Sequence, residues 1–208
     1  MSVEHSPVIP SRFPPGGDAF PLRRELAPRP FVVATMGLPG AGKSVVAKAI
    51  EEQLGLRRIC RDQIRAAMFP QCNYTFLEKR AAYRSLLLAL DINCMLGVGS
   101  VIDGMTFSRR RELDRVADVA AKHGIVTIPL LIECPPELAR RRIARDLATR
   151  RHVAADRTPE TVNDVIARRE PAPEGTLVVD ATLPEAEMCS AAIAAICDSI
   201  AAALAEST

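Results

Sequence analysis

The sequence predicts an α/β fold in which a parallel sheet is covered by helices on both faces. From residue 31 onward, short apolar runs alternate with helical patterns. The first run, 31–36, is almost continuously apolar, which is typical of a strand buried on both faces. A glycine-rich turn joins this run to the first helical pattern. Strands that alternate with helices are connected by right-handed crossovers, so they lie parallel in one sheet.

The elements follow one another in a regular order. Apolar runs are predicted as strands, and segments with apolar residues three or four apart as helices. Gly55 ends the first helix, and Pro129 lies inside the fourth strand, where it lacks an amide hydrogen for the sheet. In chain order, the predicted elements are a strand at 31–36, a helix that follows the turn at 37–44 and runs through 54, a strand at 56–60, helices at 63–69 and 75–96, a strand at 99–102, a helix at 108–123, a strand at 125–132, helices at 136–149 and 158–169, a strand at 176–179 and a helix at 184–204.

Length and composition restrict the class of protein. The chain has 208 residues, 48% hydrophobic and 25% charged, which predicts one globular domain with a sizeable core. Six widely spaced cysteines without a Cys-x-x-Cys pair predict reduced thiols rather than disulfides or a zinc site. The longest uncharged apolar stretches, such as 92–102 and 188–197, are too short for a membrane span, and no secretory signal is visible. We expect a cytoplasmic protein with no membrane partner.

Proline and charge are unevenly distributed. Residues 1–30 contain seven of the sixteen prolines, which predicts an extended or disordered leader before a domain at 31–208. The net charge of +2 is too small to argue for nucleic-acid binding. Residues 137–157 contain seven arginines against three acids. This segment suits a small, highly charged anion, with a solvated helix face as the alternative.

The turn after the first strand carries the most specific motif. Residues 37–44 read GLPGAGKS and match G-x-x-x-x-G-K-[ST] in full, between a strand and a helix. Its glycines let backbone N–H groups surround phosphate oxygens, Lys43 can reach the β- and γ-phosphates, and Ser44 can bind Mg²⁺. No Asn-Lys-x-Asp motif for guanine occurs, which argues against a GTPase but leaves both ATP and GTP open as the donor. The predicted nucleotide-binding residues are Gly37, Leu38, Pro39, Gly40, Ala41, Gly42, Lys43, Ser44 and Val45.

Two acids stand at the carboxyl edge of the predicted sheet, where ligands of open α/β folds bind. Asp62 precedes Arg65 by three residues, so both lie on one helical face. Asp62 can accept a proton from an attacking hydroxyl while Arg65 holds the acceptor; helix capping is the alternative for Asp62. Asp103 follows the third strand and can bind the magnesium shell or the acceptor, with a strand-end cap as the alternative.

Six arginines occur within residues 137–151. Arg141 and Arg145 share a helical face, as do Arg142 and Arg145. Arginines that close over the transferring phosphoryl group supply the positive charge that the reaction needs. Together with Asp62 and Lys43, these three arginines are the predicted catalytic residues; the remaining arginines are expected to face solvent.

Six motifs together resemble those of a known group, the small P-loop kinases. In order they are GLPGAGKS, RDQIR, YTFLEKRAAYRSLL, GSVIDGMTFSRRRE, IECPPELARRRIARD and LVVDAT. The group includes phage polynucleotide kinase domains, gluconate-kinase-like enzymes, chloramphenicol phosphotransferase and zeta-toxin-type kinases, and the resemblance covers about residues 31–182. It implies a three-layer P-loop NTPase fold, with a five-stranded parallel sheet of nucleoside-monophosphate-kinase type and an arginine-rich lid at about 140–158.

The same resemblance implies roles for single residues. Asp62 matches the acceptor-activating aspartate of the family, and Arg65 matches its substrate-contacting neighbour. The three arginines Arg141, Arg142 and Arg145 match the lid arginines. The lid departs from the family's Arg-aliphatic-x-x-Arg pattern, because Asp146 follows Arg142 where the second arginine is expected. The predicted acceptor-binding residues are Asp62, Arg65, Tyr74, Asp103 and Thr106, with a core position as the alternative for Tyr74. The predicted metal ligands are Ser44 and Asp103.

The leading function is transfer of the γ-phosphoryl group of ATP or GTP, with Mg²⁺, to a hydroxyl of a small molecule. By resemblance, the acceptor is an antibiotic or nucleoside-like natural product, as in self-resistance, or a sugar or sugar acid. A polynucleotide 5′-hydroxyl kinase is the second interpretation, against which the small net charge argues. A nucleotide-dependent regulatory protein is the third, against which a base beside an arginine cluster argues.

Overall fold

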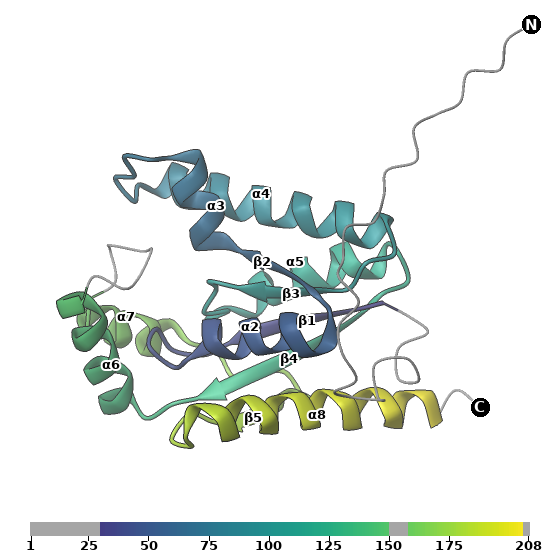
Figure 1. Cartoon of the computed structure of the whole chain (residues 1–208). Helices are drawn as coiled ribbons and strands as arrows, with labels where there is room; N and C mark the ends of the chain where they lie inside the picture. The colour runs from purple at the N-terminus through teal and green to yellow at the C-terminus, as the bar shows by residue number, and fades with distance from the viewer. Residues whose placement is uncertain (1–29, 150–157, 206–208) are drawn as a thin grey trace, which may run out of the picture.

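The computed structural model describes residues 30–149 and 158–205 and confirms the predicted architecture (Figure 1). Five parallel strands form one sheet in the order β2-β3-β1-β4-β5. The strands are β1 (Phe31–Met36), β2 (Arg57–Cys60), β3 (Ser100–Asp103), β4 (Val126–Glu133) and β5 (Leu177–Asp180). Residues 1–29 of the predicted leader and residues 150–157 of the predicted lid lie outside the described residues.

Helices on both faces of the sheet complete three layers (Figure 1). One face is covered by α2 (Lys43–Leu54) and α8 (Glu185–Ala205), which pack against each other, and the other by α4 (Phe76–Met95) and α5 (Arg110–Ala121). Three further helices stand near the carboxyl edge of the sheet: α3 (Arg61–Met68), α6 (Pro136–Thr149) and α7 (Glu160–Arg168). The glycine-rich turn opens onto the same edge.

Strand β1 lies at the centre of the sheet and contributes to both cores. All six of its residues are buried. Val33 packs on the side of α2 and α8, whereas Val32 and Ala34 pack on the side of α4 and α5. Side chains alternate between the faces of a strand, so burial of both faces explains the continuous apolar run in the sequence.

Three strands begin and end one residue later than predicted. β3, β4 and β5 each end on an acid, namely Asp103, Glu133 and Asp180. Backbone pairing continues to these residues, since Cys60 pairs with Asp103 and Glu133 with Asp180. The sequence pattern predicts that a strand ends at its last apolar side chain, whereas pairing between strands depends on backbone hydrogen bonds. The carboxyl edge of the sheet therefore carries three carboxylates.

Pro129 stays inside β4, opposite Ala34 of β1. On the other side of β4, pairing with β5 begins only at Leu130. The proline therefore has a neighbouring strand on one side only. A missing amide hydrogen is tolerated at such a position.

Helix α8 is the one helix of the described ranges that is long and apolar enough, by length and composition, to cross a membrane. The prediction of no span considered only its uncharged stretch, 188–197. Four of its residues are buried in the core beside α2: Met188, Cys189, Ala192 and Ile196. Packing in the core accounts for these four residues, whereas only 22% of the apolar window of α8 is buried.

Candidate active site

The turn between β1 and α2 has a conformation that favours glycine. Gly40 has a φ of +82°, and a Cβ atom there would lie 2.5 Å from the Ala139 carbonyl oxygen. Gly42 is the N-cap of α2 with a φ of +103°, and this helix start has no side-chain cap within the described structure. The first N–H groups of α2 are therefore not covered by a capping side chain. A helix start of this kind binds anions.

Lys43 lies against the turn that it follows. Its Nζ donates to the carbonyl oxygens of Gly37 at 3.0 Å and Leu38 at 2.7 Å, and the residue is only 9% exposed. It also lines a cavity at the carboxyl edge of the sheet. Phosphate oxygens are stronger acceptors for an ammonium group than neutral carbonyls. The position of Lys43 is suited to the predicted contact with the β- and γ-phosphates.

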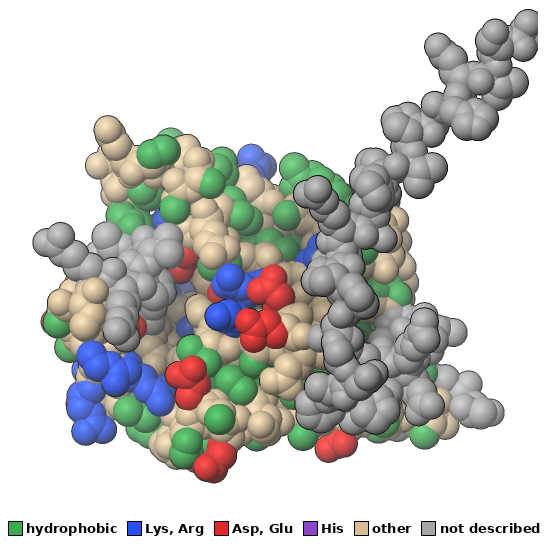
Figure 2. Space-filling view, viewed as in Figure 1, with side chains coloured by type: hydrophobic (Ala, Val, Ile, Leu, Met, Phe, Trp, Pro, Cys, Tyr) green, Lys and Arg blue, Asp and Glu red, His purple; other side chains and the backbone are tan. Residues whose placement is uncertain are grey.

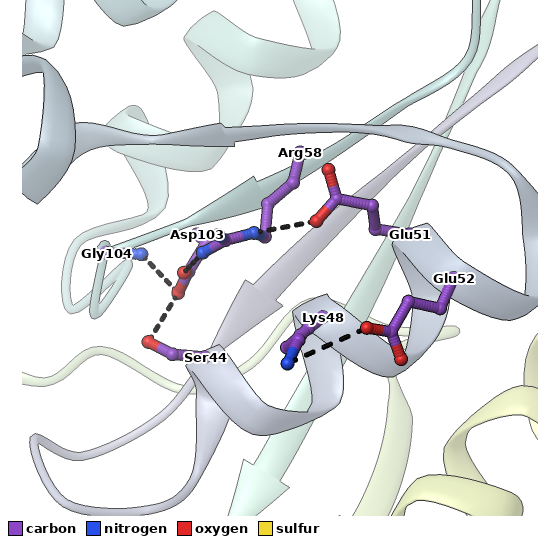
Figure 3. A network of polar contacts seen from close by, with 7 residues as sticks. All are labelled: Ser44, Lys48, Glu51, Glu52, Arg58, Asp103 and Gly104. Carbon is purple, nitrogen blue, oxygen red and sulfur yellow. Dashed lines mark hydrogen bonds and ion pairs between the residues drawn. The ribbon is translucent and has the colours of Figure 1, made fainter. Parts of the chain in front are cut away.

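Ser44 and Asp103 face each other from the start of α2 and the end of β3 (Figure 3). Ser44 Oγ donates to Asp103 Oδ1 at 2.9 Å, and Gly104 N donates to the same oxygen at 2.6 Å. No group of three or more His, Cys, Asp or Glu residues in residues 30–149 and 158–205 can hold a metal ion. Mg²⁺ needs no such cluster, because it takes one or two protein oxygens, substrate phosphates and waters. The hydroxyl and carboxylate of this pair fit that chemistry.

Asp103 has a further partner that the sequence does not reveal. Arg58 of β2 donates from Nη1 to Asp103 Oδ2 and from Nε to Glu51 Oε2, both at 3.1 Å (Figure 3). Burial acts to lower the pKa of Arg58, but the hydrogen bonds to Glu51 and Asp103 outweigh it and raise this pKa. Arg58 therefore stays charged. It fixes an Asp103 side chain that is only 1% exposed.

The surface over α2 carries this network. Figure 2 shows acidic and basic side chains next to one another near the centre of the face shown. The same helix carries a second, more exposed pair, in which Lys48 Nζ lies 3.7 Å from Glu52 Oε1. Alternating charges of this kind leave no strong positive patch over α2.

Helix α3 begins at Arg61, directly after β2, two residues earlier than predicted. Cys60 is its N-cap and no side chain caps it, so the structure does not support the capping alternative for Asp62. Asp62 Oδ1 instead lies 3.0 Å from Arg65 Nη2 and 3.4 Å from Arg61 Nη2. Asp62 lines the cavity together with Lys43.

Arg65 is almost fully enclosed, with an exposed fraction of 2%. Its guanidinium carbon lies 4.7 Å from the centroid of the Tyr74 ring, a cation–π distance. Tyr74 is not among the residues that line the cavity. Tyr74 therefore contacts the lining of the cavity through Arg65.

Cys60, the last residue of β2, lies two positions before Asp62. Burial, with the nearby carboxylates of Asp103 and Asp62, raises the pKa of the Cys60 thiol to about 11. At neutral pH the side chain is an uncharged thiol. Thiolate chemistry is not expected here.

The cavity has a volume of about 410 Å³. Leu38 and Ala41 do not line it, because their side chains enter the core. Gly37 lies at the end of β1, where its N–H donates to the Thr106 carbonyl at 3.2 Å. Asp103 does not line the cavity itself, but it accepts a hydrogen bond from Ser44, which does. The predicted site residues that line the cavity are Pro39, Gly40, Gly42, Lys43, Ser44, Val45, Asp62, Arg65, Thr106, Arg142 and Arg145.

The lid arginines occupy three different environments. Arg142 is half-buried and donates to the carbonyl oxygens of Ala41 at 3.1 Å and Ala181 at 2.9 Å, which ties α6 to the glycine-rich turn. Arg145 is exposed and lines the cavity. Arg141 is exposed and does not line it, although it lies one turn before Arg145. Figure 2 shows basic side chains gathered over α6.

Several cavity-lining residues were not predicted. The charged ones are Arg61, Lys79, Asp146, Arg168 and Glu185. Arg61 could have been predicted from the sequence, because it is adjacent to the predicted site residue Asp62. Arg168 stands in a helix without a motif, and only the folded chain brings it to the site.

Known proteins share this fold. A family described as an AAA domain matches residues 32–172. A gluconokinase from Sinorhizobium meliloti has a similar structure, with a TM-score of 0.65, 18% sequence identity, and coverage of 86% of this chain and 98% of that one. A sugar kinase from a Janibacter species has a TM-score of 0.62 and 19% identity over 80% of this chain and 94% of that one.

A third similar structure is an APS kinase from Mycobacterium tuberculosis in complex with AMPPNP and APS. Its TM-score is 0.60 at 19% identity, over 81% of this chain and 98% of that one. Curated protein sequences give no match. At these identities, the structural similarities show a shared fold.

Proposed function

The chain belongs to the AAA domain family, and from this membership and the geometry of the cavity we propose that it is a phosphotransferase acting on a small molecule. It moves the γ-phosphoryl group of ATP or GTP to a hydroxyl. The observation that carries the proposal is that Asp62 lines the same cavity as Lys43 and Ser44. A candidate base and a triphosphate-binding loop thus meet in one space of about 410 Å³.

The donor side has the groups that a triphosphate needs. The uncapped start of α2 and Lys43 bind the phosphates, and Ser44 with Asp103 would hold Mg²⁺. When bound, Mg²⁺ neutralises charge on the β- and γ-phosphates. Arg142 and Arg145 line the same cavity, Arg142 directly beside the glycine-rich turn, and guanidinium groups there stabilise charge on the transferring oxygens.

The acceptor side supplies orientation and a proton acceptor. The acceptor hydroxyl oxygen forms a bond to the γ-phosphorus as the bond from that phosphorus to the β-phosphate oxygen breaks, and ADP or GDP leaves. The hydroxyl proton passes to Asp62, which Arg65 holds at 3.0 Å. Phosphoryl transfer is loose, so Asp62 contributes more by orientation than by early proton removal.

Small acceptors suit a cavity of this size better than a polymer. The names of the similar structures, a sugar kinase and a gluconokinase, support sugars or sugar acids as acceptors. An antibiotic or nucleoside-like natural product fits the same chemistry. The enzyme would act in the cytoplasm, where nucleoside triphosphates are available.

Acceptor-stimulated release of ADP or GDP tests this function. The purified chain is incubated with Mg²⁺ and ATP, or GTP, and a panel of hydroxyl compounds that includes sugars, sugar acids, nucleosides and aminoglycoside antibiotics. We expect at least one compound to raise the release rate well above the rate without acceptor. The Lys43→Ala variant should not respond to it. A release rate that no acceptor changes contradicts the proposal.

A further inference from the structure

The charges that line the cavity are strongly unbalanced. Seven lysine or arginine side chains face three carboxylates. On the donor side, Lys43, Arg142 and Arg145 are matched by the charge of a nucleoside triphosphate. We assign the other lining cations, Arg61, Arg65, Lys79 and Arg168, to the acceptor side, where Asp62 is the one carboxylate among the described lining residues.

Asp62 is already shared between two of these cations. Its Oδ1 lies 3.0 Å from Arg65 Nη2 and 3.4 Å from Arg61 Nη2. Arg61 Nε is also buried without a hydrogen-bond partner among the described residues. Buried donors are nearly always satisfied in native proteins. An unsatisfied guanidinium N–H next to the acceptor space indicates an acceptor oxygen that a ligand supplies.

Arg168 is held toward the same space from the end of α7. Its Nε donates to Ser108 Oγ at 3.2 Å, and Ser108 is only 2% exposed. The following backbone is attached as well, because Glu170 N donates to Ser108 O at 2.9 Å and Arg110 N donates to Glu170 Oε2 at 2.7 Å. In the part of the chain that the structure describes, no carboxylate forms an ion pair with Arg168. Within the described ranges, a neutral hydroxyl thus fixes the Nε end of the guanidinium, and the two terminal nitrogens can bind a ligand.

We propose that the acceptor carries an oxyanion group, either a carboxylate or a phosphate, in addition to the hydroxyl that is phosphorylated. Arg168 binds this group with its terminal guanidinium nitrogens, and Arg61 provides a second donor. The inference rests on the proposed function and narrows it to anionic acceptors. Planar guanidinium groups bind carboxylates and phosphates through paired hydrogen bonds, which explains arginine at both positions.

Matched acceptors test the inference. The series are glucose, gluconate and glucose 6-phosphate; glycerol, glycerate and glycerol 3-phosphate; and adenosine and AMP. Steady-state kinetics with Mg²⁺ and the preferred nucleotide should give a higher kcat/KM for an anionic member than for its neutral counterpart. The carboxylate and phosphate members show which oxyanion is bound. An equal or higher kcat/KM for the neutral member overturns the inference but leaves the phosphotransferase function standing. If no compound is phosphorylated, both fail.

Substitutions at Arg168 give an independent readout. Arg168→Gln should raise the KM for the anionic acceptor by about 10-fold to 100-fold, as expected for loss of a charge-assisted hydrogen bond. The KM for the nucleotide and the melting temperature should stay unchanged, and Arg168→Lys should restore part of the loss. Arg169→Gln is the control, because Arg169 is exposed and does not line the cavity. An identical acceptor KM in the Arg168→Gln and Arg169→Gln variants contradicts the assignment.

Discussion

Ser44 Oγ donates a hydrogen bond to Asp103 Oδ1 at 2.9 Å, although the two residues lie 59 positions apart in the sequence. The contact joins the start of α2 to the end of β3. Arg58 and Gly104 N bind the same carboxylate, so its orientation is fixed from three sides. The hydroxyl of Ser44 and the carboxylate of Asp103 thus place two oxygen atoms, the ligand type that Mg²⁺ prefers, next to the glycine-rich turn.

Lys43→Ala should abolish turnover and leave the fold intact. The ammonium group contacts two main-chain carbonyls of the turn and contributes little to the apolar core. Loss of this positive charge at the phosphates should lower kcat by about 100-fold or more. Circular dichroism checks folding, and acceptor-stimulated ADP release measures the rate. Near wild-type activity in a folded variant contradicts the role of Lys43.

Asp62→Asn should lower kcat by about 10²-fold to 10⁴-fold, the usual range for a general base. Asparagine keeps an oxygen that can accept from Arg65, so the melting temperature and nucleotide affinity should change little. Asp62→Ala should also lower stability, by about 1–3 kcal/mol, because it leaves the buried Arg65 without its carboxylate. Gln63→Ala, at an exposed neighbouring position, is the control. Full activity of Asp62→Asn removes Asp62 from the mechanism.

Arg58→Ala should lower the free energy of unfolding by about 1–3 kcal/mol, because it leaves Oδ2 of a buried carboxylate without its partner. Arg58→Lys should recover part of the loss. Lys48→Ala is the matched control: it removes an ion pair on α2, the helix that carries the Arg58 partner Glu51, and the side chains of this pair are 67% and 60% exposed, so it contributes little. Urea unfolding measures all three variants. Equal midpoints for Arg58→Ala and Lys48→Ala refute a structural role for the network.

Salt should affect the acceptor reaction only mildly. A small acceptor occupies one or two cationic groups, whereas a polynucleotide that contacts six to ten phosphates loses about 10³-fold to 10⁵-fold in affinity between 50 and 200 mM salt. The measurement is kcat/KM for the acceptor against salt concentration, at saturating nucleotide. Steep loss of activity, together with labelling of oligonucleotide 5′ ends, favours the polynucleotide kinase interpretation instead.

Sequence patterns were sufficient for most of the fold. The apolar run at β1 and the motif GLPGAGKS predict the central strand, the turn and α2, because all three depend on local side-chain types. The predicted ends of the strands were less accurate. Asp103 and Asp180 close the ladders of β3 and β5 through backbone pairing, which side-chain polarity does not report.

The site was predictable only where a motif marks it. Lys43 and Asp62 line the cavity and stand in motifs. Arg58 and Arg168 carry no motif, and their partners Asp103 and Ser108 are 45 and 60 residues away in the sequence. Arg141 was predicted from helical spacing with Arg145, but only Arg145 of this pair lines the cavity, so a shared helical face does not tell which side chain reaches it.

Analysis of the reaction product tests the central claim most directly. The chain is incubated with Mg²⁺, [γ-³²P]ATP and the acceptor that stimulates ADP release most, and the products are separated and identified by mass spectrometry. We predict that the label appears on a hydroxyl oxygen of the acceptor, with one phosphoryl group transferred for each ADP formed. Release of the label only as inorganic phosphate, with the acceptor unmodified, contradicts the account and favours a nucleotide-dependent regulatory protein.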